Sequence, residues 1–170
     1  PVRTMRERGH SPAFIVWGPP GVGKTTLAGI IAHSLEIPFY TLSAVNSGVK
    51  DVREVIEHAG KNRLFSTDSP ILFIDEIHRF SKSQQDSLLA AVEKGSITLV
   101  GATTENPSFE VIRPLLSRCQ VYVLESLGKT DLLTLLERAV THDDLLRERG
   151  VKIVETDALL RFSGGDARTL

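Results

Sequence analysis

The chain has 170 residues, 41% of them hydrophobic, which is enough to bury the core of one domain with a small appendage. Its net charge of −1 excludes a generally basic protein, although a local basic patch stays compatible with that total. The single cysteine, Cys119, excludes an internal disulfide, and no apolar run reaches the length of a membrane span. We therefore expect a cytoplasmic protein, or a nuclear one in a eukaryote, and a sequence that is part of a longer chain.

Strands and helices are expected to alternate along most of the chain. Residues 1–12 resemble the end of a helix followed by a loop. The patterns then predict strands at 13–17, 38–43, 70–75, 97–101 and 121–124, and helices at 26–35, 52–60, 82–93 and 114–117. From residue 129 onward only helices are expected, at 131–139 and 156–162. This order predicts an α/β fold with a parallel five-stranded sheet flanked by helices (1–126), followed by a small helical subdomain (127–170).

The sequence GPPGVGKT at residues 18–25 fits the phosphate-binding loop G-x-x-x-x-G-K-[ST] at every fixed position, between an expected strand and an expected helix. Lys24 is expected to reach the β- and γ-phosphates of ATP, and the Thr25 hydroxyl to ligate Mg²⁺. A glycine-rich turn without a ligand is the alternative, and the presence of both residues disfavours it. The residues expected to hold the nucleotide are Gly18, Pro19, Pro20, Gly21, Val22, Gly23, Lys24, Thr25 and Thr26.

Two acidic residues directly follow the apolar run at 71–74. Open α/β sheets bind their ligands at the carboxyl ends of the strands, so both residues are candidates for the same site. Asp75 is expected to place Mg²⁺, and Glu76 to polarise the water that attacks the γ-phosphate. The alternative is that the pair only caps the next helix. Glu76 favours a protein that hydrolyses ATP over one that only binds it.

Three further polar residues extend the predicted site. Thr104, preferred over Thr103 by its offset from the fourth strand, can contact the γ-phosphate and the attacking water, unless it only stabilises a polar turn. Arg118 is a candidate for completing a neighbouring subunit's site, since transition-state charge requires a fixed planar cation. Its alternative is a solvated or salt-bridged arginine. Arg168 is expected in the first turns of a helix that opens at Ser163, where a cation is unfavourable unless it meets an anion.

These motifs, in this order, resemble those of AAA+ ATPases of the clamp-loader group. Residues 18–25 look like Walker A, 75–76 like Walker B, Thr104 like sensor 1, Arg118 like the arginine finger and Arg168 like sensor 2. The strings FIDEIHRF at 73–80, KSQQD at 82–86 and GATTENPSF at 101–109 closely resemble the RarA/MgsA family of replication-associated recombination proteins, which includes the Werner helicase-interacting protein.

The resemblance implies a DNA-dependent, Mg²⁺-requiring ATPase that assembles as a tetramer. It implies action at stalled replication forks and single-strand/double-strand junctions, and association with single-strand-binding protein. The sequence departs from the family by lacking most of the N-terminal region that holds the adenine and the C-terminal oligomerisation domain. Arg79 and Lys82 start a helix that faces the central channel in clamp-loader relatives, so they are candidates for contacts with DNA phosphates. A solvated helix start is the equally simple alternative.

Three other functions fit parts of the sequence. The string DEIH at 75–78 also spells the second motif of DExH helicases, but a helicase core requires two such domains. An ATP-gated interaction module, in which hydrolysis is incidental, would not need Glu76. A small-molecule kinase would leave Arg118 without a role.

Overall fold

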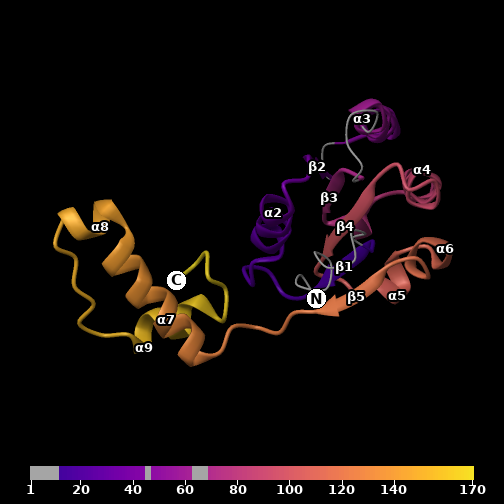
Figure 1. Cartoon of the computed structure of the whole chain (residues 1–170). Helices are drawn as coiled ribbons and strands as arrows, with labels where there is room; N and C mark the ends of the chain where they lie inside the picture. The colour runs from indigo at the N-terminus through magenta and orange to yellow at the C-terminus, as the bar shows by residue number, and fades with distance from the viewer. Residues whose placement is uncertain (1–11, 45–46, 63–68) are drawn as a thin grey trace. The chain divides into compact units, whose positions relative to one another are not determined.

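The computed structural model describes residues 12–44, 47–62 and 69–170 (Figure 1). Their contacts divide them into two compact units. One unit contains residues 12–17 and the described residues of 24–123, and the other contains residues 18–23 and 124–170. The helix end and loop expected at 1–12 fall outside the described residues, apart from residue 12.

The first unit is built on a parallel sheet of five strands in the order β2-β3-β4-β1-β5, which confirms the expected sheet. β4 separates β1 from β3, so the strand before the glycine-rich loop and the strand that ends in Asp75 share one neighbour. The strands are β1 (Phe14–Trp17), β2 (Phe39–Ser43), β3 (Ile71–Asp75), β4 (Thr98–Thr103) and β5 (Gln120–Val123).

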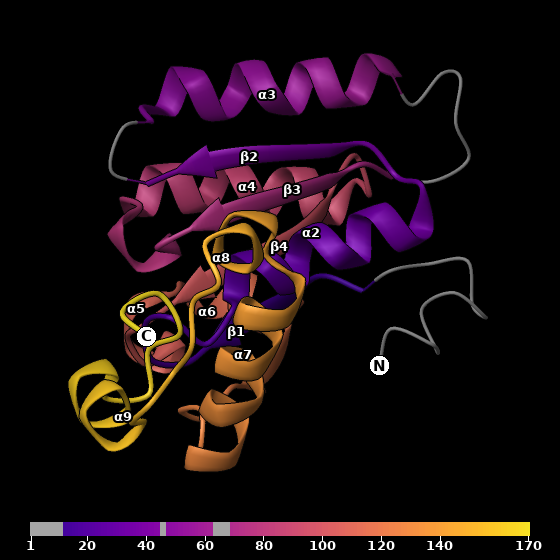
Figure 2. The same ribbon diagram turned by 90° about the vertical axis from the view of Figure 1, so that its left-hand side faces the viewer.

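Helices cover both faces of this sheet. Figure 1 shows α2 on one side and α4, α5 and α6 on the other, and Figure 2 shows α3 running alongside β2. Burial on two faces explains the continuous apolar run of β3, where a half-exposed strand would alternate. The helices of this unit are α2 (Lys24–Leu35), α3 (Val49–Asn62), α4 (Lys82–Glu93), α5 (Pro107–Glu110) and α6 (Arg113–Leu116), with a short 3-10 helix η2 (Ile77–Arg79).

Alternate side chains of the central strands enter different halves of the core. Ile15 and Leu72 belong to the hydrophobic cluster that includes α3, α4 and α6 side chains, whereas Phe14 and Phe73 are equally buried outside that cluster. Each of these buried side chains contributes about 1.5–3 kcal/mol relative to an exposed position. Gly101 leaves room for η2, since a Cβ on this residue would lie 3.1 Å from Cδ1 of Ile77.

Two local expectations for the first unit need correction. The short helix α5 lies between the strand expected at 97–101 and the helix expected at 114–117, where the sequence predicted no helix. Asn106 caps it by accepting a hydrogen bond from Ser108 N at 3.0 Å, and Pro107 occupies its first turn. α3 begins at Val49, before its expected start at residue 52, and Asp51 Oδ2 in its first turn accepts a hydrogen bond from Gly48 N at 2.6 Å.

The described part of the second unit contains helices and no strand: α7 (Lys129–His142), α8 (Asp144–Glu148) and α9 (Asp157–Ser163). The sequence predicted α7 and α9 and missed α8, whose cap is Asp143 Oδ1 accepting from Leu146 N at 3.0 Å. The helix expected to open at Ser163 is wrong for the described residues. Ser163 ends α9, and Gly164 and Gly165 take positive φ angles of 55° and 91° that lead into a turn.

Candidate functional site

Residues 18–23, which connect β1 to α2 in the chain, have the conformation that their glycines allow. Gly21 and Gly23 have φ angles of 72° and 89°, in the left-handed region that other residues rarely adopt. Gly21 is constrained further, because its carbonyl accepts a hydrogen bond from Ala167 N at 3.3 Å and a Cβ here would collide with the side chain of Asp166. The glycines at these two positions are therefore required by the backbone itself.

The start of α2 suits an anion. The backbone N–H groups of a first helical turn lack partners within the helix, and the helix dipole adds partial positive charge there. α2 carries no acidic residue in its first turn, so nothing on the helix neutralises this end. Lys24 is largely buried, with 8% of its surface exposed, whereas Thr25 and Thr26 are exposed. This arrangement fits the phosphate groups of a nucleotide.

Asp75 and Glu76 lie at the carboxyl end of β3, and their backbones differ. Asp75 closes the strand and is paired in register with Ser43 of β2. Glu76 follows in the left-handed region, with φ 54° and ψ 47°, just before η2. This conformation costs a residue with a Cβ about 1–2 kcal/mol, so the surrounding structure has to hold it. Ile77, fully buried in the core, fixes the next position.

The Glu76 carboxylate meets two side chains. Thr104 Oγ1 donates a hydrogen bond to Glu76 Oε2 at 3.4 Å, and His78 Nδ1 lies 3.2 Å from the same oxygen. Thr103 is fully buried, and its hydroxyl is engaged by the backbone of Glu105. The structure therefore brings Thr104 rather than Thr103 to Glu76. The sequence reasoning missed the role of His78 beside Glu76, although a histidine two residues after the acid was visible.

The residues at the strand ends fit a magnesium ion that is only partly held by protein. Within the described part of the chain no three His, Cys, Asp or Glu residues cluster as a metal cage. Mg²⁺ commonly takes one or two protein oxygens and completes its octahedron with phosphates and water. The exposed Thr25 hydroxyl and the partly exposed Asp75 carboxylate supply such oxygens.

The two predicted arginines have other partners. Arg118 Nη2 lies 2.5 Å from Glu93 Oε1, and its Nη1 donates to Pro114 O at 2.7 Å. Arg168 Nε lies 3.6 Å from Asp166 Oδ1 within the second unit. Their side chains are 41% and 71% exposed. Within the first unit, no contact among the described residues joins Arg118 to Glu76 or Thr104.

Burial makes the one cysteine unsuited to chemistry. Desolvation raises the pKa of the Cys119 thiol to about 11, so the reactive thiolate is scarce near neutral pH.

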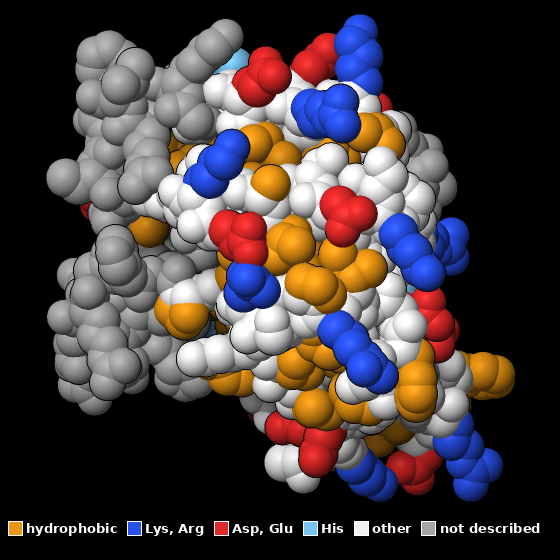
Figure 3. Space-filling model, turned by 90° about the vertical axis from the view of Figure 1, so that its right-hand side faces the viewer, with side chains coloured by type: hydrophobic (Ala, Val, Ile, Leu, Met, Phe, Trp, Pro, Cys, Tyr) orange, Lys and Arg blue, Asp and Glu red, His pale blue; other side chains and the backbone are white. Residues whose placement is uncertain are grey.

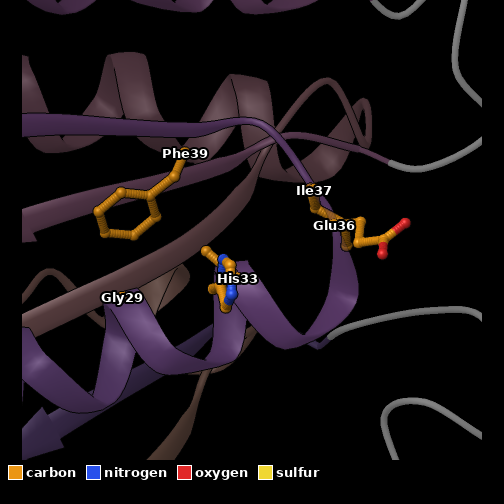
Figure 4. Close-up of a pocket in the computed structure, with 6 residues that line it drawn as sticks. Gly29, His33, Glu36, Ile37 and Phe39 are labelled. Carbon is orange, nitrogen blue, oxygen red and sulfur yellow. The ribbon is translucent and has the colours of Figure 1, made fainter.

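An open pocket lies at the far end of α2 (Figure 4). It is lined by Gly29, Ala32, His33, Glu36, Ile37 and Phe39. His33 is nine residues after Lys24, about 14 Å along the helix at 1.5 Å per residue. The pocket is therefore separate from the predicted phosphate site.

The face of the molecule drawn in Figure 3 carries charges of both signs. On the face shown in Figure 3, basic and acidic side chains are interspersed, and neither forms a continuous patch. Arg79 and Lys82 are both exposed, as contact with an external anion would require.

A family model for the ATPase family associated with various cellular activities (AAA) matches residues 14–127. The chain belongs to this family. The parallel sheet covered by helices is the fold that the sequence predicted. The family match places the DEIH string at 75–78 in an AAA ATPase rather than in a DExH helicase core. None of the helices in the described part of the chain has the length and apolar character needed to cross a membrane.

Relatives of this AAA domain confirm the expected resemblance. The chain is 50% identical to Replication-associated recombination protein A of Coxiella burnetii over 95% of its own length and 37% of that protein. It is 50% identical to ATPase WRNIP1 of Dictyostelium discoideum over 98% of its length and 19% of that protein. The chain thus spans less than two fifths of these relatives.

A solved structure shares the architecture of this AAA domain. The RuvB Holliday junction branch migration motor of Thermotoga maritima is 30% identical and superposes with a TM-score of 0.78, over 99% of this chain and 55% of that one.

Proposed function

We propose that this chain is the nucleotide-hydrolysing part of a Mg²⁺-dependent ATPase that acts on DNA at single-strand/double-strand junctions, such as those of stalled replication forks. The observation that carries the enzymatic part is the Glu76 carboxylate at the end of β3, with the Thr104 hydroxyl hydrogen-bonded to it. A carboxylate and a hydroxyl that converge at the carboxyl edge of a parallel sheet can hold a water between them.

Each residue has a proposed role in that reaction. The loop at 18–23 and Lys24 bind the phosphates, while Thr25 and Asp75 hold Mg²⁺. The bound ion neutralises charge on the phosphate oxygens. Glu76 accepts the proton of the attacking water, and Thr104 orients that water and senses the γ-phosphate.

Two further roles are proposed for arginines. We propose that Arg118 completes the site of a neighbouring subunit in a homo-oligomer, a tetramer in the full-length protein. Arg168 is proposed to contact the γ-phosphate of its own subunit from a helical lid formed by residues 127–170. The Arg118 and Arg168 side chains are 41% and 71% exposed, and each forms an ion pair with an exposed or partly exposed acid, which supports their availability. Single-strand-binding protein is a proposed partner.

The names of similar proteins support the proposed action on DNA. The relative from Coxiella burnetii is called a replication-associated recombination protein, and the RuvB structure is called a Holliday junction branch migration motor. The exposed cations Arg79 and Lys82 are the proposed contacts with DNA phosphates.

Steady-state ATP hydrolysis by the full-length protein, with and without junction DNA, tests this function. We expect hydrolysis that junction DNA stimulates several-fold above duplex or single-stranded DNA of equal length. Hydrolysis that responds to no DNA would contradict the DNA part and leave the ATPase. An absence of hydrolysis under all conditions would contradict both.

A double substitution refines the DNA contact. Replacing Arg79 and Lys82 with alanine is expected to lower the ratio of the rates with and without junction DNA. The control replaces Lys50 and Lys129, two exposed lysines on α3 and α7, and should leave that ratio unchanged. Equal ratios in the two double variants would remove Arg79 and Lys82 from the DNA interface.

A further inference from the structure

His78 lies in the centre of a small hydrogen-bonded network at the end of the sheet. Its Nδ1 is 3.2 Å from Glu76 Oε2 and 3.0 Å from Thr103 Oγ1. Its side chain is only 13% exposed, so these contacts are shielded from solvent. The histidine thus connects the residue after β3 to the last residue of β4.

The network fixes which ring nitrogen of His78 carries the proton. An ionised carboxylate can only accept hydrogen bonds, so Nδ1 has to be the donor toward Glu76. The Thr103 hydroxyl has one proton, which it donates to Glu105 O at 3.1 Å. The same hydroxyl oxygen accepts from Glu105 N at 3.0 Å and can accept from Nδ1–H as well. Nδ1–H therefore has two oxygens within reach, Thr103 Oγ1 at 3.0 Å and Glu76 Oε2 at 3.2 Å.

Both side-chain contacts of Glu76 reach the same carboxylate oxygen. Thr104 and His78 both contact Oε2. Among the described residues, none donates to Oε1. A carboxylate held by one oxygen presents the other in a fixed direction, which a proton acceptor requires.

The left-handed backbone of Glu76 does not by itself fix the direction of its carboxylate. A left-handed glutamate is unfavourable, and on its own it would not fix the carboxylate, since χ angles beyond Cβ stay free. Ile77 anchors the main chain, and His78 reaches back from η2 to the carboxylate.

We propose that His78 is a positioning residue for ATP hydrolysis: its Nδ1–H, which lies between Thr103 Oγ1 and Glu76 Oε2, holds Oε2 of Glu76 so that Oε1 faces the attacking water. This inference rests on the proposed function, because it assumes that Glu76 is the base. His78 itself does not contact the nucleotide in this role, so its loss should affect turnover rather than ATP affinity.

Three substitutions in the full-length protein test the inference. His78→Asn keeps an N–H donor at the position of Nδ1, His78→Gln places its donor near the position of Nε2, and His78→Leu fills the space without a donor. We expect His78→Leu and His78→Gln to lower kcat by about 10–100-fold and His78→Asn by no more than about threefold. The affinity for ATP, measured by equilibrium binding with Mg²⁺, should change by no more than about twofold in all three.

The outcomes separate this inference from the proposed function. Wild-type kcat in His78→Leu, or equal losses in the Asn and Gln variants, would overturn the role of Nδ1–H. If His78→Leu does not fold, as judged by thermal melting, the contrast between Asn and Gln decides alone. Glu76→Gln is measured in parallel: an active Glu76→Gln enzyme would overturn the proposed function, whereas an inactive one with an unaffected His78→Leu would overturn only this inference.

Discussion

Glu76 and Arg118 are proposed for the same reaction, but their surroundings differ. The Glu76 side chain is 27% exposed and is held by Thr104 and His78 from within its own unit. The Arg118 side chain is 41% exposed and forms an ion pair with Glu93. Ion pairs this exposed contribute about 0–1 kcal/mol, so Arg118 can leave its partner at small cost. The proposed base is thus held by contacts within one chain, whereas Arg118 is in an exposed ion pair that it can exchange for another partner.

The same substitution at two glutamates sharpens this contrast. Glu76→Gln removes the proton acceptor and is expected to lower kcat by about 10²–10⁴-fold with ATP binding retained. Glu93→Gln weakens only an exposed ion pair and should change kcat by no more than about twofold. Both variants are compared by steady-state hydrolysis and by equilibrium ATP binding. Full hydrolysis by Glu76→Gln would remove the basis for the carboxylate role, and full biological function without hydrolysis would favour an ATP-gated interaction module.

The same substitution at two glycines compares the glycine-rich loop at 18–23 with the interior of α2. Gly21→Ala forces a Cβ into a left-handed conformation and onto Asp166, and should lower the melting temperature and weaken ATP binding. Gly29→Ala, in the interior of α2 with open space around the new Cβ, should raise stability by about 0.5–1 kcal/mol, or a few degrees in melting temperature. Shifts of the same sign in the two variants would contradict the backbone argument.

The sequence predicted those parts of the fold in which local pattern and tertiary structure agree. The apolar run of β3 and the glycine-rich loop were sufficient to predict a parallel sheet with acidic residues at its carboxyl edge. Thr104 rather than Thr103 contacts Glu76, and its role in hydrolysis stays a prediction. By contrast, α5 is a single turn that depends on one cap and one proline, so periodicity could not reveal it.

The features that the sequence did not predict have two causes, a local backbone conformation and contacts between distant residues. The helix expected after Ser163 is replaced by a turn, because two consecutive glycines adopt positive φ angles there. The link from His78 to Glu76 and Thr103 brings residues 25 positions apart within 3.0 Å, and no spacing rule encodes it. A side-chain network of this kind becomes visible only when the strand order places β3 beside β4.

A mixing experiment tests the central claim that one chain supplies the base and another the arginine. Full-length Arg118→Ala and Lys24→Ala proteins should each be nearly inactive alone, since each lacks a group that every site needs. Mixed in equal amounts, they should recover hydrolysis, because an intact Lys24 in one subunit meets an intact Arg118 in its neighbour at about a quarter of the interfaces in a ring. No recovery in mixtures shown to co-assemble, or an Arg118→Ala protein that is fully active alone, would contradict the account.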